Sequence, residues 1–120
     1  MIKIGGNLTA TIQKKSTQKN RIGEGEPSYI TVGTIVGWLD YVSGDNAISQ
    51  YRGKVQDTTH VFLCDHDKWT QAVQDAGVTG ENSRLVINKN PYNVLFIDNP
   101  MELNEHMELY LQYVGGGING

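Results

Sequence analysis

The alternation of apolar and polar residues along the chain predicts six β-strands. Successive side chains of a strand point to opposite sides, so an apolar residue at every second position indicates one buried face. The pattern occurs at Leu8–Gln13, Thr31–Gly44, Thr58–Asp65, Ser83–Asn88, Tyr92–Asp98 and Glu105–Val114. The longest run, Thr31–Gly44, contains Gly33 and Gly37, and glycines inside a strand predict a bend or a close backbone approach. Asn88-Lys89-Asn90-Pro91 reads as a tight hairpin turn.

Two stretches have helical patterns. Asp67–Gly77 carries apolar residues at i, i+3, i+4 and i+7, with Asp67 placed as its cap and Gly77 placed to end it. Asp45–Gln56 reads as a shorter helix capped by Asp45 and ended by Gly53. A helix of one or two turns is not stable alone in water, so we expect this second segment to dock on the domain or on a neighbour.

These elements predict a mainly β fold, a small antiparallel β-barrel of about six strands with one or two short helices. The chain of 120 residues is long enough for one domain with a modest core, which we place at residues 1–114. Residues 115–120 are expected to form a flexible glycine-rich tail. A single cysteine, Cys64, excludes an internal disulfide, and no apolar run is long enough for a membrane span.

Charge is distributed unevenly along the chain. Residues 1–21 contain lysine and arginine but no acid, whereas residues 90–120 contain four acids (Asp98, Glu102, Glu105 and Glu108) and no lysine or arginine. This polarity suits subunits that meet head to side, although an ordinary solvated surface would look the same. The net charge of −3 argues against general nucleic-acid binding, which needs a basic face.

The residues that could carry chemistry are few. His60, Cys64 and His66 are weak candidates for a metal site, since thiolate and imidazole are zinc ligands. Their spacing matches no common ligand motif, and the simpler interpretation makes Cys64 a small buried apolar residue at the end of a strand. A nucleophile–base pair of Cys64 and His66 lacks an orienting third group. We therefore expect no catalytic residues, no metal, no cofactor and no enzyme activity.

Aromatic residues at strand and helix spacing are expected mostly in the core. Trp38 and Tyr110 lie on the more polar faces of their strands and are candidates for an interface.

Four segments of the sequence together resemble the phage head–tail joining proteins, also called head-closure or stopper proteins. They are ATIQKK (10–15), TIVGWLDYVSG (34–44), SQYRG (49–53) and TTHVFLCD (58–65). The late hairpin Arg84–Ile97 and the closing strand Glu105–Val114 match the two-strand return at the end of the family's pattern. Tyr41 stands where the family often has proline. Residues 68–82, with the capped helix, look like an insertion at a place where the family usually has a short turn.

The resemblance implies a small barrel that forms a ring of identical subunits below the portal and its adaptor. Such a ring closes the DNA channel and docks the tail, so the expected partners are the portal-adaptor protein and a tail-completion protein. Packaged DNA would be touched at most indirectly, and no membrane is involved. The expected location is the host bacterial cytoplasm during assembly and then the head–tail connector of the virion.

The resemblance also implies a channel-closing loop, which would be formed by Asp45, Asn46, Ile48, Gln50, Tyr51, Arg52 and Lys54. The mixed charge of the long loop that follows the first strand, together with the two aromatic residues on polar strand faces, predicts an interface. It would include Lys14, Lys15, Lys19, Arg21, Glu24, Glu26, Trp38 and Tyr110. Two alternatives stay open: a tail-completion or terminator protein of the same connector, and a small metal- or ligand-binding β-barrel built around His60, Cys64 and His66.

Overall fold

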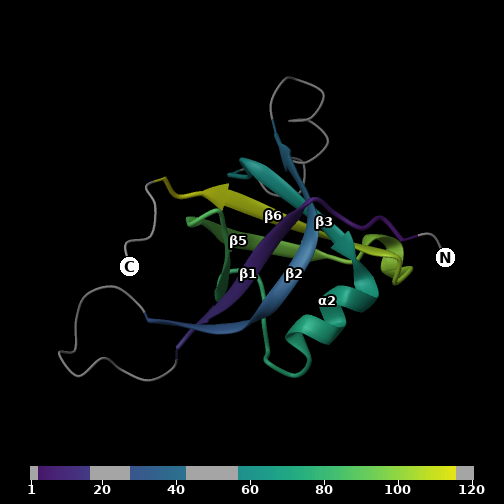
Figure 1. Cartoon of the computed structure of the whole chain (residues 1–120), viewed down its shortest axis with the longest axis horizontal. Coiled ribbons are helices and arrows are strands. Elements are labelled where there is room, and N and C mark those ends of the chain that lie inside the picture. The colour runs from purple at the N-terminus through teal and green to yellow at the C-terminus, as the bar shows by residue number, and fades with distance from the viewer. Residues whose placement is uncertain (1–2, 17–27, 43–56, 116–120) are drawn as a thin grey trace.

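The computed structural model describes residues 3–16, 28–42 and 57–115, and these form a closed antiparallel β-barrel (Figure 1). The strand order around the barrel is β1-β2-β3-β6-β5-β4. The strands are β1 (Leu8–Lys15), β2 (Tyr29–Tyr41), β3 (His60–Asp65), β4 (Ser83–Ile87), β5 (Asn90–Asp98) and β6 (His106–Tyr113). This confirms the predicted six-stranded barrel. No helix in these three ranges has the length and apolar character needed to cross a membrane.

Strand β2 is the long bent strand that the two glycines predicted. Its first part pairs with β1 as far as Gly37, and its last part, from Trp38 to Tyr41, pairs with β3. At Gly37 a methyl group would collide with the carbonyl oxygen of Leu63 and the ring of Phe62. Glycine therefore allows the strand to change neighbours at the point where the backbones approach most closely.

Helix α2 (His66–Val73) lies against β2, and both ends differ from the predicted Asp67–Gly77. Asp65, not Asp67, takes the N-cap position, and its side chain makes no capping hydrogen bond. At the other end Gln74 has a φ of 43°, so the helix stops there and Gly77 follows it outside the helix. The predicted ends were wrong because Asp65 and Asp67 are both capping residue types, and because Gln74 already leaves helical geometry three residues before Gly77.

The hairpin between β4 and β5 has its turn where it was predicted to begin, but Asn90 and Pro91, which were expected in the turn, already belong to β5. Asn88 and Lys89 have φ angles of 51° and 66°, and Ile87 pairs with Asn90. Positive φ at both central residues is the backbone of the two-residue turn that matches the twist of a hairpin.

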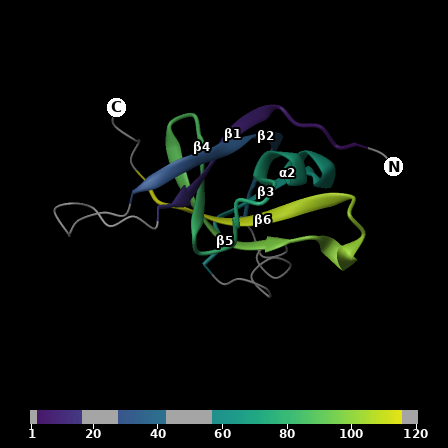
Figure 2. The same cartoon turned by 90° about the horizontal axis from the view of Figure 1, so that it is seen from below.

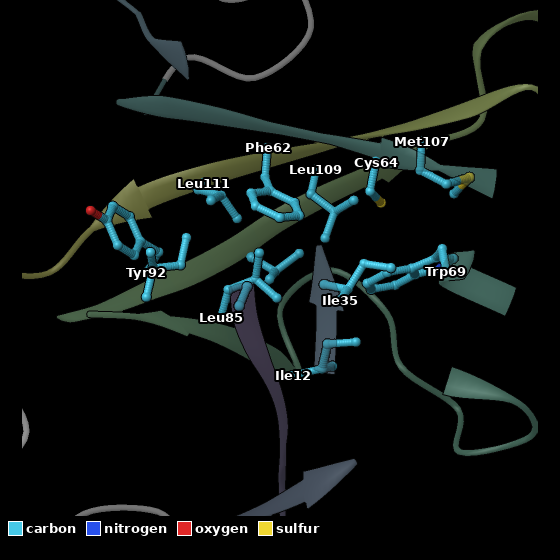
Figure 3. Close-up of a cluster of buried hydrophobic side chains, with 13 residues drawn as sticks. Ile12, Ile35, Phe62, Cys64, Trp69, Leu85, Tyr92, Met107, Leu109 and Leu111 are labelled. Carbon is cyan, nitrogen blue, oxygen red and sulfur yellow. The ribbon is translucent and has the colours of Figure 1, made fainter. Parts of the chain in front are cut away.

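Thirteen buried side chains fill the barrel interior (Figure 3). Tyr92 lies at one end of this cluster and Trp69, from α2, lies at the other, with Phe62 and Leu109 between them. The helix is therefore part of the core, because its tryptophan covers one end of the barrel. A smaller, separate buried cluster is formed by Val42, which follows β2, Val61 of β3 and Tyr110 of β6.

Candidate functional site

The metal-ligand candidates His60, Cys64 and His66 do not converge. His60 and Cys64 occupy opposite ends of β3, about 13 Å apart at the usual rise of a strand. Cys64 is fully buried, and this burial, together with the charge of Asp65, raises the pKa of its thiol to about 12. Such a thiol stays protonated at neutral pH and lacks the thiolate needed by a nucleophile or metal ligand. Across the described ranges, no three His, Cys, Asp or Glu side chains are grouped to hold a metal ion.

His60 lies in a cluster of tyrosine rings at the end of the barrel. Its ring centroid is 5.1 Å from those of Tyr41 and Tyr92 and 6.2 Å from that of Tyr113. The hydroxyl oxygen of Thr59 accepts the backbone N–H of Tyr113 at 2.7 Å and lies 2.9 Å from Nδ1 of His60. Burial lowers the pKa of His60 below its ordinary value. The imidazole of His60 is therefore held among three tyrosine rings, with the Thr59 hydroxyl as the hydrogen-bond partner of Nδ1.

We predict that acid destabilises the barrel through His60. Because the folded-state pKa lies below the unfolded value of 6.5, the contribution of His60 is complete above that pH and is lost as the pH falls toward the folded-state pKa. The free energy of unfolding, measured in urea at about pH 7 and about pH 5, should therefore fall less in His60→Gln than in the wild type. An equal fall in both proteins would contradict this expectation.

Two lysines of the basic N-terminal range, Lys14 and Lys15, lie at the end of β1. The ammonium group of Lys14 donates to the carbonyl oxygen of Ala76 at 2.7 Å, and Lys15 is exposed. On the adjacent strand β4, the guanidinium carbon of Arg84 lies 3.8 Å from the ring centroid of Tyr29, a cation–π contact. These cationic residues therefore lie on neighbouring ends of β1 and β4, with Lys14 bound to the chain after α2 and Arg84 stacked on Tyr29.

Trp38 lies on the outer surface, as predicted, and also holds the N-terminal segment. Its side chain is 40% exposed, and its indole N–H donates to the carbonyl oxygen of Ile4 at 2.8 Å. Just beyond, the carboxylate of Asp65 accepts the backbone N–H groups of Ile4 and Gly5 at 2.8 and 3.0 Å. The sequence pattern alone did not reveal that these N-terminal residues lie across β2 and β3.

Tyr110 does not have the exposure that its polar neighbours suggested. It is 1% exposed, packs with Val42 and Val61, and meets the ring of Phe96 at 6.0 Å. Its hydroxyl donates to the carboxylate of Glu108 at 2.8 Å. The side chain is therefore not accessible to a partner in the folded chain, and its assignment to an interface is corrected. The alternation identified its face of the strand but not the burial of that face.

Two grooves flank α2 where the helix lies against β2, and the sequence analysis did not anticipate either. One has a volume of about 670 Å³ and is lined by residues 30–33 and 71–76. The other has a volume of about 500 Å³ and lies between β2, the start of α2 and Gly5. Helix and strand approach closely at Gly33, where a methyl group would lie 2.9 Å from the carbonyl oxygen of Ala72. The small residues at this contact were the only signal in the sequence.

Several predicted site residues lie outside the described residues. These are the predicted channel-closing residues Asp45, Asn46, Ile48, Gln50, Tyr51, Arg52 and Lys54, and the predicted interface residues Lys19, Arg21, Glu24 and Glu26. The predicted helix at 45–56 and most of the predicted tail, residues 116–120, also lie outside them. Their roles therefore rest on the sequence.

Comparison with known proteins places the chain in no family. It matches no protein-family model and no curated protein sequence. A function must therefore be argued from the sequence motifs and the geometry of the barrel.

Proposed function

We propose that this chain is a structural head-completion, or stopper, protein of a tailed phage or prophage particle. In this role it forms a ring of identical subunits below the portal and its adaptor, closes the DNA channel and docks the tail. The proposal is supported by the resemblance of Thr34–Gly44 and Thr58–Asp65 to the head–tail joining proteins. A small antiparallel barrel is also the fold that this resemblance implies.

The main support for this proposal is the exposure of large apolar side chains on the outer surface of the barrel. The interior is packed with side chains, so contacts with partners are made on the outer surface of the barrel. Large apolar side chains nevertheless remain exposed on that surface: Ile30, Val36, Trp38, Tyr41, Phe96, Met101, Leu103, Tyr113 and Val114. Exposed apolar groups of this kind are typical of surfaces that partners cover. A structural part of a larger assembly has this character.

Deletion of Asn46–Lys54 tests the proposed closure of the channel. We expect the shortened chain to keep its barrel, because the described core contains none of these residues. Particles assembled with it should lose packaged DNA, measured as DNA accessible to nuclease after packaging. Wild-type protein supplied in trans is the control. Particles that retain their DNA with the shortened chain would refute the closing role of this segment.

Binding experiments test which layer of the head–tail connector this chain occupies. The purified chain should bind the portal–adaptor complex and, once bound, recruit the tail-completion protein. Binding to the tail tube without binding to the portal–adaptor complex would instead assign the chain to tail completion, with the same fold and a different neighbour.

A further inference from the structure

The first part of β2 has a neighbouring strand on one side only, among the residues that the structure describes. On one side β1 pairs with β2 from Tyr29 as far as Gly37. On the other side β3 begins to pair with β2 only at Trp38, and α2 lies beside the preceding residues (Figures 1 and 2). A strand edge without a neighbouring strand offers backbone N–H and C=O groups that can pair with another chain.

The backbone groups of Tyr29 and Thr31 point to this unpaired side. The N–H of Ser16 donates to the carbonyl oxygen of Ser28 at 2.8 Å, so the backbone groups of Ser28 point to β1. In an antiparallel pair these groups alternate between the two sides of a strand, so those of the next residue and of Thr31 point away from β1. Residues 29–32, on this side of β2, are here called the open edge.

The groove of about 670 Å³ lies along the open edge. It is closed at Gly33, where a methyl group would lie 2.9 Å from the carbonyl oxygen of Ala72. Ile30 and Val32 contribute apolar surface on the β2 side, and the small side chain of Ala76 leaves room on the other side. A strand added to the open edge would therefore contact both β2 and the end of α2. An extended peptide binds an exposed sheet edge in this way, through backbone hydrogen bonds and pockets for alternate side chains.

A single extended segment fits this groove better than the edge of a second barrel. Because α2 lies beside the same edge, a second copy would bring its own α2 to the place where its β2 would have to pair. The charge of the lining points to the kind of segment. Asp75 is its one acid, and it contains no lysine or arginine. The last turn of α2 has no basic residue either, and the carboxyl end of a helix attracts positive charge.

We propose that the open edge binds an extended peptide segment of a partner protein, which adds a short strand to β2 in the groove beside α2. The segment has an apolar residue at every second position and a lysine or arginine that meets Asp75. The inference does not depend on the proposed function, because it follows from the unpaired strand edge and the lining of the groove.

Peptide selection with the full chain tests this site. A displayed library of random short peptides is panned against the wild type and, in parallel, against Thr31→Pro. We expect peptides with alternating apolar residues and a basic residue to be enriched on the wild type alone. Enrichment of no peptide, or of the same peptides on both chains, would overturn the proposal.

Thr31→Pro and Thr31→Val form a matched pair. Proline lacks the N–H that points to the open edge, and the barrel should tolerate it because that N–H is not part of the pairing with β1. Valine keeps the N–H, and both variants lose the 3.5 Å contact of the Thr31 hydroxyl with the Gln13 side chain. A synthetic copy of a selected peptide should bind Thr31→Val like the wild type and Thr31→Pro at least about tenfold more weakly, measured by fluorescence anisotropy. Equal binding to the two variants would contradict pairing with the backbone.

Ala76→Phe provides a second variant in case Thr31→Pro does not fold. Its ring should fill the groove from the α2 side and abolish binding while leaving the backbone of β2 unchanged. Thermal unfolding checks that the barrel is retained. Full binding of the selected peptide to folded Ala76→Phe would place the peptide elsewhere on the barrel.

Amide hydrogen exchange, followed by NMR, detects the added strand directly. The N–H of Thr31 should exchange rapidly in the free chain and at least about tenfold more slowly with saturating peptide. The N–H of Ile30, which points to β1, is the control and should exchange slowly in both states. An unchanged exchange rate at Thr31 would overturn the proposal.

Asp75→Asn tests the basic residue of the partner segment. Binding of a lysine-containing selected peptide should weaken about twofold to fivefold at low salt, since an exposed ion pair contributes little. Unchanged affinity would contradict the basic residue. Self-association of the wild type that Thr31→Pro abolishes would make a second copy the occupant and would overturn the proposal.

Discussion

Replacing Phe62 by alanine is expected to lower the free energy of unfolding by about 3–5 kcal/mol, the largest effect of any single substitution considered for this chain. The ring is fully buried in the middle of the core and packs beneath β2 at Gly37 (Figure 3). Its removal loses the transfer free energy of the ring and leaves a cavity that the closed barrel cannot collapse, because every strand is paired on both sides. The loss is a large part of the stability of an ordinary domain.

Urea unfolding followed by tryptophan fluorescence measures this loss, and Phe96→Ala is the matched control. Phe96 is the other phenylalanine of the chain and is 43% exposed on β5. Since much of its ring is already in contact with solvent, its truncation should cost about 1 kcal/mol or less. Equal losses from the two substitutions would show that the interior described for this barrel does not provide its stability.

Replacing Asp65 by alanine is expected to lower the free energy of unfolding by about 3 kcal/mol. Its side chain is 4% exposed, and its two oxygens accept the N–H groups of Ile4 and Gly5. Hydrogen bonds to a charged group contribute about 1.5–3 kcal/mol each, and removal of the buried carboxylate recovers part of its desolvation cost. We expect the N-terminal segment to detach from β2 and β3, and limited proteolysis should then cleave the variant near its N-terminus.

Asp67→Ala is the control for this prediction. Asp67 also contacts the N-terminal segment, through an ion pair with Lys3, and this hydrogen bond lowers the pKa of the Asp67 carboxyl group. The pair is exposed to solvent, where such contacts contribute little. Asp67→Ala should therefore unfold and resist proteases much like the wild type. If Asp67→Ala were as destabilised as Asp65→Ala, the buried carboxylate would have no special role.

Much of the barrel could be predicted because strand alternation is a local property. The alternation in Thr58–Asp65 predicted one buried face, and Phe62 and Cys64, two positions apart on this strand, both lie in the core. Gly37 was expected at a close approach, and the two-residue turn at Asn88 was expected from its residue types. In each case the few neighbouring residues contain the information, since side-chain direction and turn conformation depend on the local backbone.

The candidate surfaces could be predicted only in part. The basic residues Lys14 and Lys15 and the exposed Trp38 were found from charge and alternation. The groove beside Gly33 and the hydrogen bonds that close the connection between β5 and β6 were not. No local pattern reveals them, because the groove depends on how α2 packs on β2 and the bonds depend on the geometry of the Asn99 and Asn104 side chains.

The sequence by itself determined that this protein is a β-barrel, where its six strands lie, and that residues 1–21 are basic whereas residues 90–120 are acidic. Only the tertiary structure decided that α2 begins after Asp65 and ends before Gln74, that Tyr110 is buried, and that an N-terminal segment crosses β2. The physical reason is the distance along the chain over which each effect acts. Alternation and turn chemistry act over a few residues, whereas a cap that binds a distant N–H or a ring that packs on another strand depends on partners brought together only by folding.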